Sequence, residues 1–183
     1  MGRFKEKIAR KLLGFLFHNA NQEYQKFHST MSDKIRLDEV QTFRKRYGIP
    51  PEFRFNGQHI LFYGNGEIIC GATSYIGSFS TVQAFDNCKV IIGERCSISH
   101  NVRMYTQSKV ADQDMSITDL KYVTGNITIE DHAWIGANVF INPGVTIGTN
   151  SIVGANSVVT KDIPPNTIFG GVPAKLIREK RIQ

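Results

Sequence analysis

An aliphatic residue recurs at every sixth position between residues 129 and 163. The segment divides into the hexads IEDHAW, IGANVF, INPGVT, IGTNSI, VGANSV and VTKDIP. Small or β-branched residues also hold the fifth position of each hexad. The first positions are Ile129, Ile135, Ile141, Ile147, Val153 and Val159, and the fifth positions are Ala133, Val139, Val145, Ser151, Ser157 and Ile163. Neither a helix nor a single long strand has this period.

The fourth position of these hexads carries residues that tolerate a left-handed backbone, namely Asn138, Gly144, Asn150 and Asn156. A short strand followed by a turn is therefore repeated six times. One hexad cannot bury its own aliphatic residue, but three hexads that close a triangular coil direct these side chains to a shared axis. Stacked coils then form a continuous core. The pattern predicts a parallel β-helix, because a β-sandwich would show turn signals every 8–12 residues or so.

Less regular hexads occur earlier in the chain, starting at Ile76, Val82, Ile92, Ile98 and Met104. Ile129 follows Met104 by 25 positions, one more than four hexads, and residues 107–126 lack the aliphatic column. We expect residues 107–126 to form a loop ejected from the coil. Long loops on a rigid scaffold commonly carry function.

The fold class predicted is an all-β core with N-terminal α-helices and one ejected loop. Residues 1–58 are expected to be helical, residues 59–169 to form the β-helix, and residues 170–183 to form a basic C-terminal segment. Gly170, Gly171 and Pro173 predict a tight turn at the start of that segment.

Residues 2–29 have the pattern of a basic amphipathic helix. The apolar positions are Phe4, Ile8, Leu12, Phe15 and Leu16, and the basic ones are Arg3, Lys5, Lys7, Arg10 and Lys11. The apolar stripe could pack on the β-helix or on a neighbouring subunit, or it could make a peripheral contact with a membrane of anionic lipid. A second short helix is expected from Lys34 to Tyr47, with Pro50 and Pro51 ending it.

The charge and composition of the chain limit the classes of ligand that it is expected to bind. A net charge of +6 and a pI near 9.3 favour anionic ligands such as nucleotide-bearing cofactors, phosphosugars or lipid head groups. Nucleic-acid binding would favour a basic stripe with interleaved aromatic residues, whereas the basic residues here cluster at the two ends of the chain, which argues against nucleic acid. Cys70, Cys88 and Cys96 are neither an even set nor a CxxC pair, so reduced thiols and a cytoplasmic location are predicted. We find neither a membrane-spanning stretch nor a signal peptide.

The segment ITIEDHAWIGANVFINPGVTIGTNSIVGANSVVTKDIPPNTIFGGVPAKLIRE resembles the C-terminal signature of the hexapeptide-repeat acyltransferases. The similar branch contains galactoside and maltose acetyltransferases, streptogramin acetyltransferases and polysaccharide O-acetyltransferases. The resemblance extends from about residue 60 to residue 179. It implies that the β-helix is left-handed, that the protein is a homotrimer, and that acetyl-CoA lies in clefts between subunits.

The resemblance also implies a set of coenzyme contacts. Backbone amides at small residues can bond the pantetheine arm as an added strand would, and the cations can meet the phosphates. The matching positions are Trp134, Ala137, Ala155, Thr160, Lys161, Lys175 and Arg178.

The catalytic histidine of the family does not carry over. The family has a stretch like YTxxHP, whereas YTQSKV places Lys109 at the histidine position. A lysine is protonated at pH 7 unless burial lowers its pKa. His100 in ISHNVR could act as the base, and Asp112 and Asp114 could orient it or accept a proton themselves. An acceptor amine that arrives deprotonated would need mainly positioning.

The predicted function is an acetyl-CoA-dependent O-acetyltransferase that acts on a sugar hydroxyl in surface polysaccharide or glycolipid biosynthesis. Transfer is expected to be direct, because no Cys or Ser has a recognisable activating neighbour. An amino-sugar N-acetyltransferase and a non-catalytic trimeric relative remain alternatives. A γ-type carbonic anhydrase needs three histidines around zinc, but residues 60–169 contain only His100 and His132, so no metal site is predicted. His132, beside Trp134, is also a weaker candidate for the base because its position predicts a corner.

Overall fold

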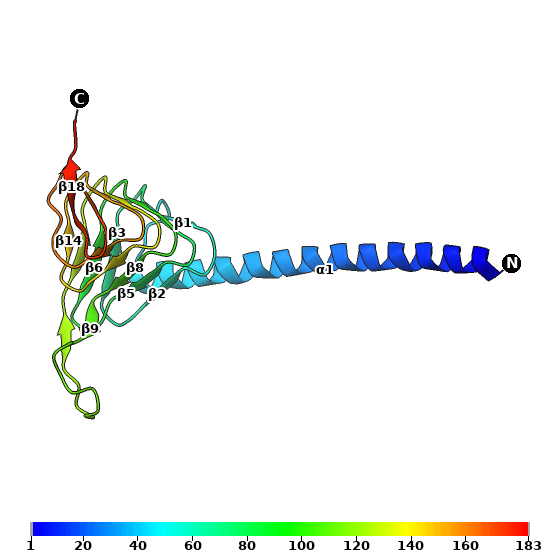
Figure 1. The fold of residues 1–183 in the computed structure, drawn as a ribbon, viewed down its shortest axis with the longest axis horizontal. Helices are drawn as coiled ribbons and strands as arrows, with labels where there is room; N and C mark the ends of the chain where they lie inside the picture. Colours follow the sequence, from blue (N-terminus) through cyan, green and yellow to red (C-terminus); the bar gives the residue numbers. More distant parts are fainter. Residues whose placement is uncertain (1, 183) are drawn as a thin grey trace. The chain divides into compact units, whose positions relative to one another are not determined.

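The computed structural model describes residues 2–182 and, for side chains, residues 10–182. It divides the chain into a first unit up to Gln41 and a second unit from Thr42 onward. One continuous helix, α1 (Gly2–Tyr47), replaces the two helices expected from the sequence (Figure 1). The segment TMSD between them contains neither Pro nor Gly, and the Thr30 hydroxyl donates back to the Lys26 carbonyl (2.8 Å). The helical hydrogen-bond pattern therefore continues through it.

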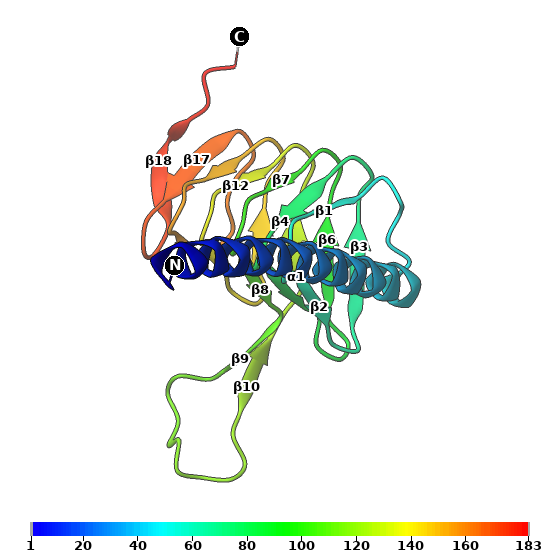
Figure 2. The same ribbon diagram turned by 90° about the vertical axis from the view of Figure 1, so that its right-hand side faces the viewer.

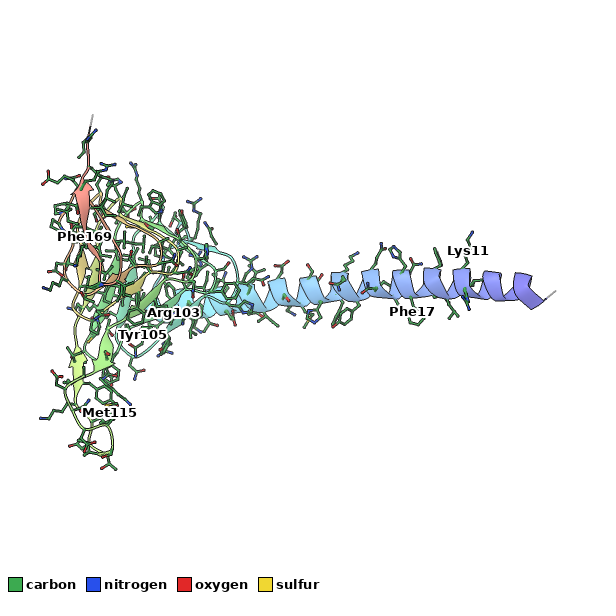
Figure 3. All side chains as sticks on the ribbon, viewed as in Figure 1. Lys11, Phe17, Arg103, Tyr105, Met115 and Phe169 are labelled. Carbon is green, nitrogen blue, oxygen red and sulfur yellow. The ribbon has the colours of Figure 1, made fainter. Side chains whose placement is uncertain are left out.

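The side chains of α1 from Arg10 to Met31 are exposed. Leu12, Phe15 and Leu16 of the predicted apolar stripe are each more than half exposed, and Figure 3 shows Lys11 and Phe17 projecting from the helix. The side chains of Phe4, Ile8 and their basic neighbours up to Lys7 lie outside the described residues. Among the described residues, no helix combines the length and the apolar character needed to cross a bilayer.

The second unit is a left-handed β-helix whose chain passes through three parallel sheets in turn. Sheet I contains β1 (Arg54–Asn56), β4 (Tyr75–Gly77), β7 (Ser97–Ile98), β12 (Trp134–Ile135), β15 (Ile152–Val153) and β17 (Thr167–Gly170), extended by β18 (Lys175–Glu179). Sheet II contains β2 (Leu61–Tyr63), β5 (Thr81–Gln83), β8 (Arg103–Tyr105), β13 (Phe140–Ile141) and β16 (Val158–Val159). Sheet III contains β3 (Glu67–Cys70), β6 (Lys89–Ile92), β11 (Ile127–Ile129) and β14 (Thr146–Ile147). We name the turns between them the I–II, II–III and III–I corners.

The aliphatic column of the sequence is the core of this coil. Ile135 pairs with Val153 in sheet I, and Ile141 pairs with Val159 in sheet II, in each case 18 residues or three hexads further along. All of the first-position side chains are at most 1% exposed. Ser151 and Ser157 fit the buried fifth position because their hydroxyls donate to the carbonyls of Gly148 (2.5 Å) and Gly154 (2.6 Å).

The corners have the predicted left-handed backbone. Asn138, Asn150 and Asn156 have φ values of 59°, 57° and 58°, and Gly144 has 82°. At the I–II corner the asparagine amides form a ladder, in which Asn101 donates to Asn138 (2.8 Å) and Asn138 donates to Asn156 (2.9 Å). The side chains thus stabilise a conformation that the backbone alone disfavours.

Both ends of the coil are covered by other parts of the chain. Strand β1 pairs with β4 and so precedes residue 59, where the sequence pattern placed the start of the β-helix. Phe43 of α1 packs on Phe55 and Phe62 of this first coil, and Phe53 completes the aromatic cluster. At the other end the chain turns after Gly171 (φ 100°), and β18 runs back antiparallel to β17, in agreement with the predicted tight turn.

Residues 107–126 leave the coil at the II–III corner, as predicted. The base of the loop is an antiparallel ribbon of β9 (Gln107–Lys109) and β10 (Tyr122–Thr124), which Figure 2 shows extending away from the coil. The Gly125 amide donates to the Thr106 carbonyl (2.9 Å) where the ribbon returns. Figure 3 places Met115 in the far part of the loop.

Candidate active site

His100, Ala137 and Ala155 occupy the same position of three successive coils at the I–II corner. The main-chain N–H of Asn138 donates to the His100 carbonyl (3.1 Å), and the main-chain N–H of Asn156 donates to the Ala137 carbonyl (2.8 Å). Neighbouring coils therefore lie one strand spacing, about 4.8 Å, apart along this column. The column is closely packed, because a Cβ on Gly136 would lie 2.6 Å from the Ala155 nitrogen. It forms a narrow ridge with two small side chains and one imidazole.

Trp134 lies on the outer face of sheet I, three residues before Ala137. Its register partner is Ile152, which pairs with Ile168, and Ile168 pairs with Arg178. Trp134 is 51% exposed, so its indole is available to a ligand beside the corner. The sheet therefore connects the predicted indole and guanidinium contacts in one row.

A positively charged hollow lies at the C-terminal end of that row. Its volume is about 520 Å³, and its lining includes Ile168, Arg178, Lys180 and Arg181. The Lys180 ammonium donates to the Asn150 side-chain oxygen (2.6 Å). Three cations around one hollow favour a phosphate-bearing ligand. Lys180 and Arg181 were not among the predicted contacts, although they follow the predicted Arg178 in the basic run REKR. The predicted Lys175 is exposed at the other end of β18.

The remaining predicted residues lie on or next to the II–III corner, which sheet II separates from His100 in one copy of the chain. Thr160 and Lys161 are exposed there, in the turn after β16. Lys109 is exposed on β9 opposite Tyr122, rather than buried as a lysine base would need to be. Asp112 is exposed further along the loop.

Asp114 has a structural role in the turn of the loop. Its carboxylate accepts hydrogen bonds from the Ser116 amide (2.9 Å) and hydroxyl (2.7 Å), and these bonds hold the pKa of the Asp114 carboxyl below its usual value. Gln113 ties the loop together: its amide donates to the Val110 (2.8 Å) and Lys121 (3.0 Å) carbonyls and accepts from the Lys121 N–H (2.7 Å). The loop therefore has a defined shape around Asp112.

His100 is exposed and borders an open pocket of about 500 Å³. The other lining residues are Asn56, Tyr75, Gly77, Ser78, Phe79 and Ser99. His132, in contrast, lies at the III–I corner with φ 62°, as its hexad position predicted, and sheet I separates it from His100. Of the two histidines, only His100 lies in line with Ala137 and Ala155.

The three cysteine thiols are buried, and the described side chains do not form a metal-binding cluster. Cys70, Cys88 and Cys96 are free and buried, and burial raises the pKa of the Cys70 thiol to about 12. A thiol in that environment is a poor nucleophile. Within residues 10–182, no three His, Cys, Asp or Glu side chains gather closely enough to hold a metal ion.

Comparison with known proteins agrees with this architecture. The bacterial transferase hexapeptide family (six repeats) matches residues 126–161. A provisionally assigned acetyltransferase of Schizosaccharomyces pombe is 30% identical over 168 residues, which are 88% of this chain and 80% of the relative. WbbJ of Escherichia coli K12, provisionally assigned to lipopolysaccharide biosynthesis as an O-acetyl transferase, is 49% identical over 129 residues, 67% of this chain and 66% of WbbJ.

The solved structure of a maltose O-acetyltransferase from Clostridium difficile 630 matches with a TM-score of 0.56 and 28% identity, over 83% of this chain and 89% of that one. Other relatives are longer: the chain is 38% identical to the galactoside O-acetyltransferase of Escherichia coli K12 over 119 residues, 65% of this chain but 58% of the relative. A three-sided β-helix with a ridge of small residues defines a class of transferases. The chain belongs to the hexapeptide-repeat acyltransferase family.

Proposed function

We propose that the protein transfers an acetyl group from acetyl-CoA to a hydroxyl group of a sugar. The observation that carries the proposal is the alignment of His100 with Ala137 and Ala155 on one ridge at the I–II corner. The cationic hollow lies at the other edge of sheet I, where Lys180 contacts Asn150 at the III–I corner. The names of the galactoside and maltose O-acetyltransferases support a sugar acceptor. WbbJ supports an acceptor in surface polysaccharide biosynthesis.

The ridge suits the shape of acetyl-CoA. In the proposed complex, Arg178, Lys180 and Arg181 bind the phosphates, and Trp134 covers the adjoining part of the arm. The pantetheine amides bond the backbone at Ala155 and Ala137, where larger side chains would block them. The thioester then reaches the next coil, about 4.8 Å further on, where His100 lies.

His100 acts as the general base in this proposal. A neutral imidazole takes the proton of the sugar hydroxyl while the oxygen attacks the thioester carbonyl, so that a C–O bond forms. The C–S bond then breaks, and the imidazolium returns its proton to the departing thiolate of CoA. The transfer is direct because the three cysteines are buried away from the surface.

A homotrimer completes the site. In one copy, sheet II separates the I–II corner with His100 from the II–III corner with Thr160, Lys161 and the loop 107–126. Cyclic symmetry brings different surfaces of neighbouring copies together. We place the I–II corner of one copy against the II–III corner of the next, so that Lys161 meets the coenzyme and Asp112 orients His100 from the neighbouring loop.

The N-terminal part of α1 makes a peripheral contact with anionic membrane in this proposal. Arg10 and Lys11 precede exposed Leu12, Leu13 and Phe17, which is the combination of an interfacial helix. Such a contact would bring the enzyme close to lipid-linked sugars.

Two measurements on the full chain test the function. CoA should raise the melting temperature, and acetyl-CoA should release thiol with at least one neutral sugar glycoside in an acceptor panel. Turnover with amino sugars alone would replace O-acetylation by N-acetylation. Stabilisation by CoA without turnover on any acceptor would identify a non-catalytic relative.

A further inference from the structure

Phe79 has an unusual backbone for a large aromatic residue. It lies at the I–II corner with φ 61°, a region that bulky residues seldom occupy. The same corner position in the later coils belongs to Asn101, Asn138 and Asn156, whose amides form the ladder described above. Phe79 therefore ends the ladder and cannot make its hydrogen bond.

The side chain of Phe79 gains little burial in return for this strain. It is 55% exposed, and its main ring contact is His59 of the preceding coil, stacked at 5.1 Å between centroids with 21° between the planes. His59 also has a positive φ, of 56°. Two strained residues thus present a stacked pair of flat rings at the surface. Because Thr73 and Arg95 at another corner share this backbone, the exposed ring pair distinguishes Phe79 and His59 more than the φ values do.

Phe79 lines a pocket that contains both aromatic and polar side chains. The pocket beside Phe79 includes Tyr75 as a second ring, Asn56 and Ser99 as hydrogen-bonding side chains, and His100. An open pocket with aromatic walls and a few polar groups is a typical small-molecule site. A pyranose ring matches it, because its C–H face can rest on the negative face of an aromatic ring while its hydroxyls reach polar side chains.

We propose that Phe79, supported by His59, is the platform on which the acceptor sugar stacks, with one hydroxyl directed to His100. This inference rests on the proposed function, because it gives the acceptor a place beside the proposed base. In this inference the acceptor binds at Phe79, in the coil that precedes the coil of His100 along the chain. The coenzyme binds the coils that follow His100. It also commits the acceptor to a sugar ring with an exposed C–H face.

The substitution Phe79→Asn separates this role from a role in packing. Asparagine tolerates the positive φ and places an amide next to Asn101, so the variant should melt a few degrees higher, about 2–4 °C. A gain in stability accompanied by a loss of sugar binding is not expected of a packing residue. Phe79→Tyr keeps the ring, and Phe27→Asn removes an equally exposed phenylalanine from α1 as a control.

Saturation-transfer NMR on the full chain measures sugar binding without turnover. The probes are the methyl glycosides of glucose, galactose, mannose, rhamnose and N-acetylglucosamine at millimolar concentration. At least one should receive saturation from the wild type, Phe79→Tyr and Phe27→Asn, and should lose it with Phe79→Asn. With the same sugar as acceptor, Phe79→Asn should raise KM at least tenfold and leave the stabilisation by CoA unchanged.

The outcomes distinguish the platform from the reaction. No binding by the wild type, or equal binding by Phe79→Asn, overturns the platform. Sugar binding that depends on Phe79 but never yields thiol release overturns the acetyl transfer and leaves the platform standing. Thiol release with an unchanged KM in Phe79→Asn overturns the platform and leaves the acetyl transfer standing.

Discussion

The amide of Asn138 donates to the carbonyl of His100, and this bond sets the imidazole one coil away from Ala137 on the same ridge. A surface histidine would ordinarily attract little notice. Here the backbone hydrogen bonds between coils align it with Ala137 and Ala155, whose small side chains leave room for the proposed coenzyme.

Replacing His100 by Ala should lower kcat at least tenfold, and losses of about 10²–10⁴ are typical when a general base is removed. The hydrogen bond between the Asn138 N–H and the His100 carbonyl involves only the backbone, so CoA should still raise the melting temperature by the same amount. The measurement is thiol release under saturating substrates. His132→Asn at the III–I corner is the matched control, because asparagine suits its positive φ, and it should retain activity. Full activity of His100→Ala would remove His100 from the mechanism.

In the proposed homotrimer, mixing two variants that each carry one defect should restore activity. His100→Ala damages the I–II corner and Lys161→Glu damages the II–III corner, so a cleft between one copy of each kind can contain two intact surfaces. Random mixing leaves about a quarter of the clefts intact in a cyclic trimer. Co-refolded mixtures should therefore exceed both parents in thiol release. Activity no higher than that of the parents would place both residues in one copy's site.

Gln113→Ala should loosen the loop 107–126 without unfolding the coil. The variant loses three hydrogen bonds that join residues 110, 113 and 121, whereas the core stays intact. Limited trypsin digestion should cleave faster after Lys109 or Lys121, with a melting temperature near that of the wild type. Gln107→Ala, in the ribbon at the base of the loop, serves as the control. Equal digestion rates would show that the clamp does not hold the loop.

The protein should lose stability as the pH rises from about 9 to 12. Burial raises the pKa of Cys70 from 9.0 to about 12, so above pH 9 the thiol ionises in the unfolded chain but stays neutral in the folded one. The loss attributable to Cys70 at pH 10.5 is about 2 kcal/mol. Urea unfolding at pH 8 and pH 10.5 should show it in the wild type and not in Cys70→Ala. Parallel losses in both proteins would assign the effect to other groups.

The native thiols should also react slowly with a disulfide reagent at pH 8, since all three are buried. All of them should react after unfolding. A thiol-release assay on the folded enzyme can therefore use such a reagent with a low background.

The N-terminal segment should bind anionic vesicles and release them at high salt. Each basic residue near an anionic surface contributes about 1 kcal/mol, so Arg10→Gln and Lys11→Gln should each weaken binding about fivefold. Leu13→Glu should abolish it by charging the apolar side. Co-sedimentation with phosphatidylglycerol vesicles measures this, with Lys26→Gln as the control. Equal binding to neutral vesicles would contradict an electrostatic contact.

The hexads made the coil predictable because each position of the hexad has a fixed place in the coil. Ile129 and its successors point inward, and Asn138, Asn150 and Asn156 adopt the positive φ that their residue type tolerates. The break in the helix near residue 30 was wrong, because a polar segment without Pro or Gly gives no local signal of where a helix continues. Sequence spacing also could not show that His100 and Lys109, nine residues apart, lie on different corners. That separation depends on how the three sheets close.

The pocket residues could not be found from sequence for a similar reason. Phe79 lies in a hexad where an aromatic residue only weakens the pattern, and Tyr75 looks like an ordinary strand residue. Their proximity to His100 arises from stacking of coils some 20 residues apart in the chain, as the register of Tyr75 with Ser97 shows. Likewise, Lys180 and Arg181 become part of a hollow only because β18 folds back along β17.

The asparagine ladder ends at Asn101, and in the preceding coil the aromatic side chain of Phe79 replaces the amide. In the proposed complex, coils on one side of that boundary bind the acetyl donor, and coils on the other side bind the acceptor. Exchanging residues 54–79 for those of another family member should therefore redirect the enzyme to a new acceptor and leave donor binding unchanged.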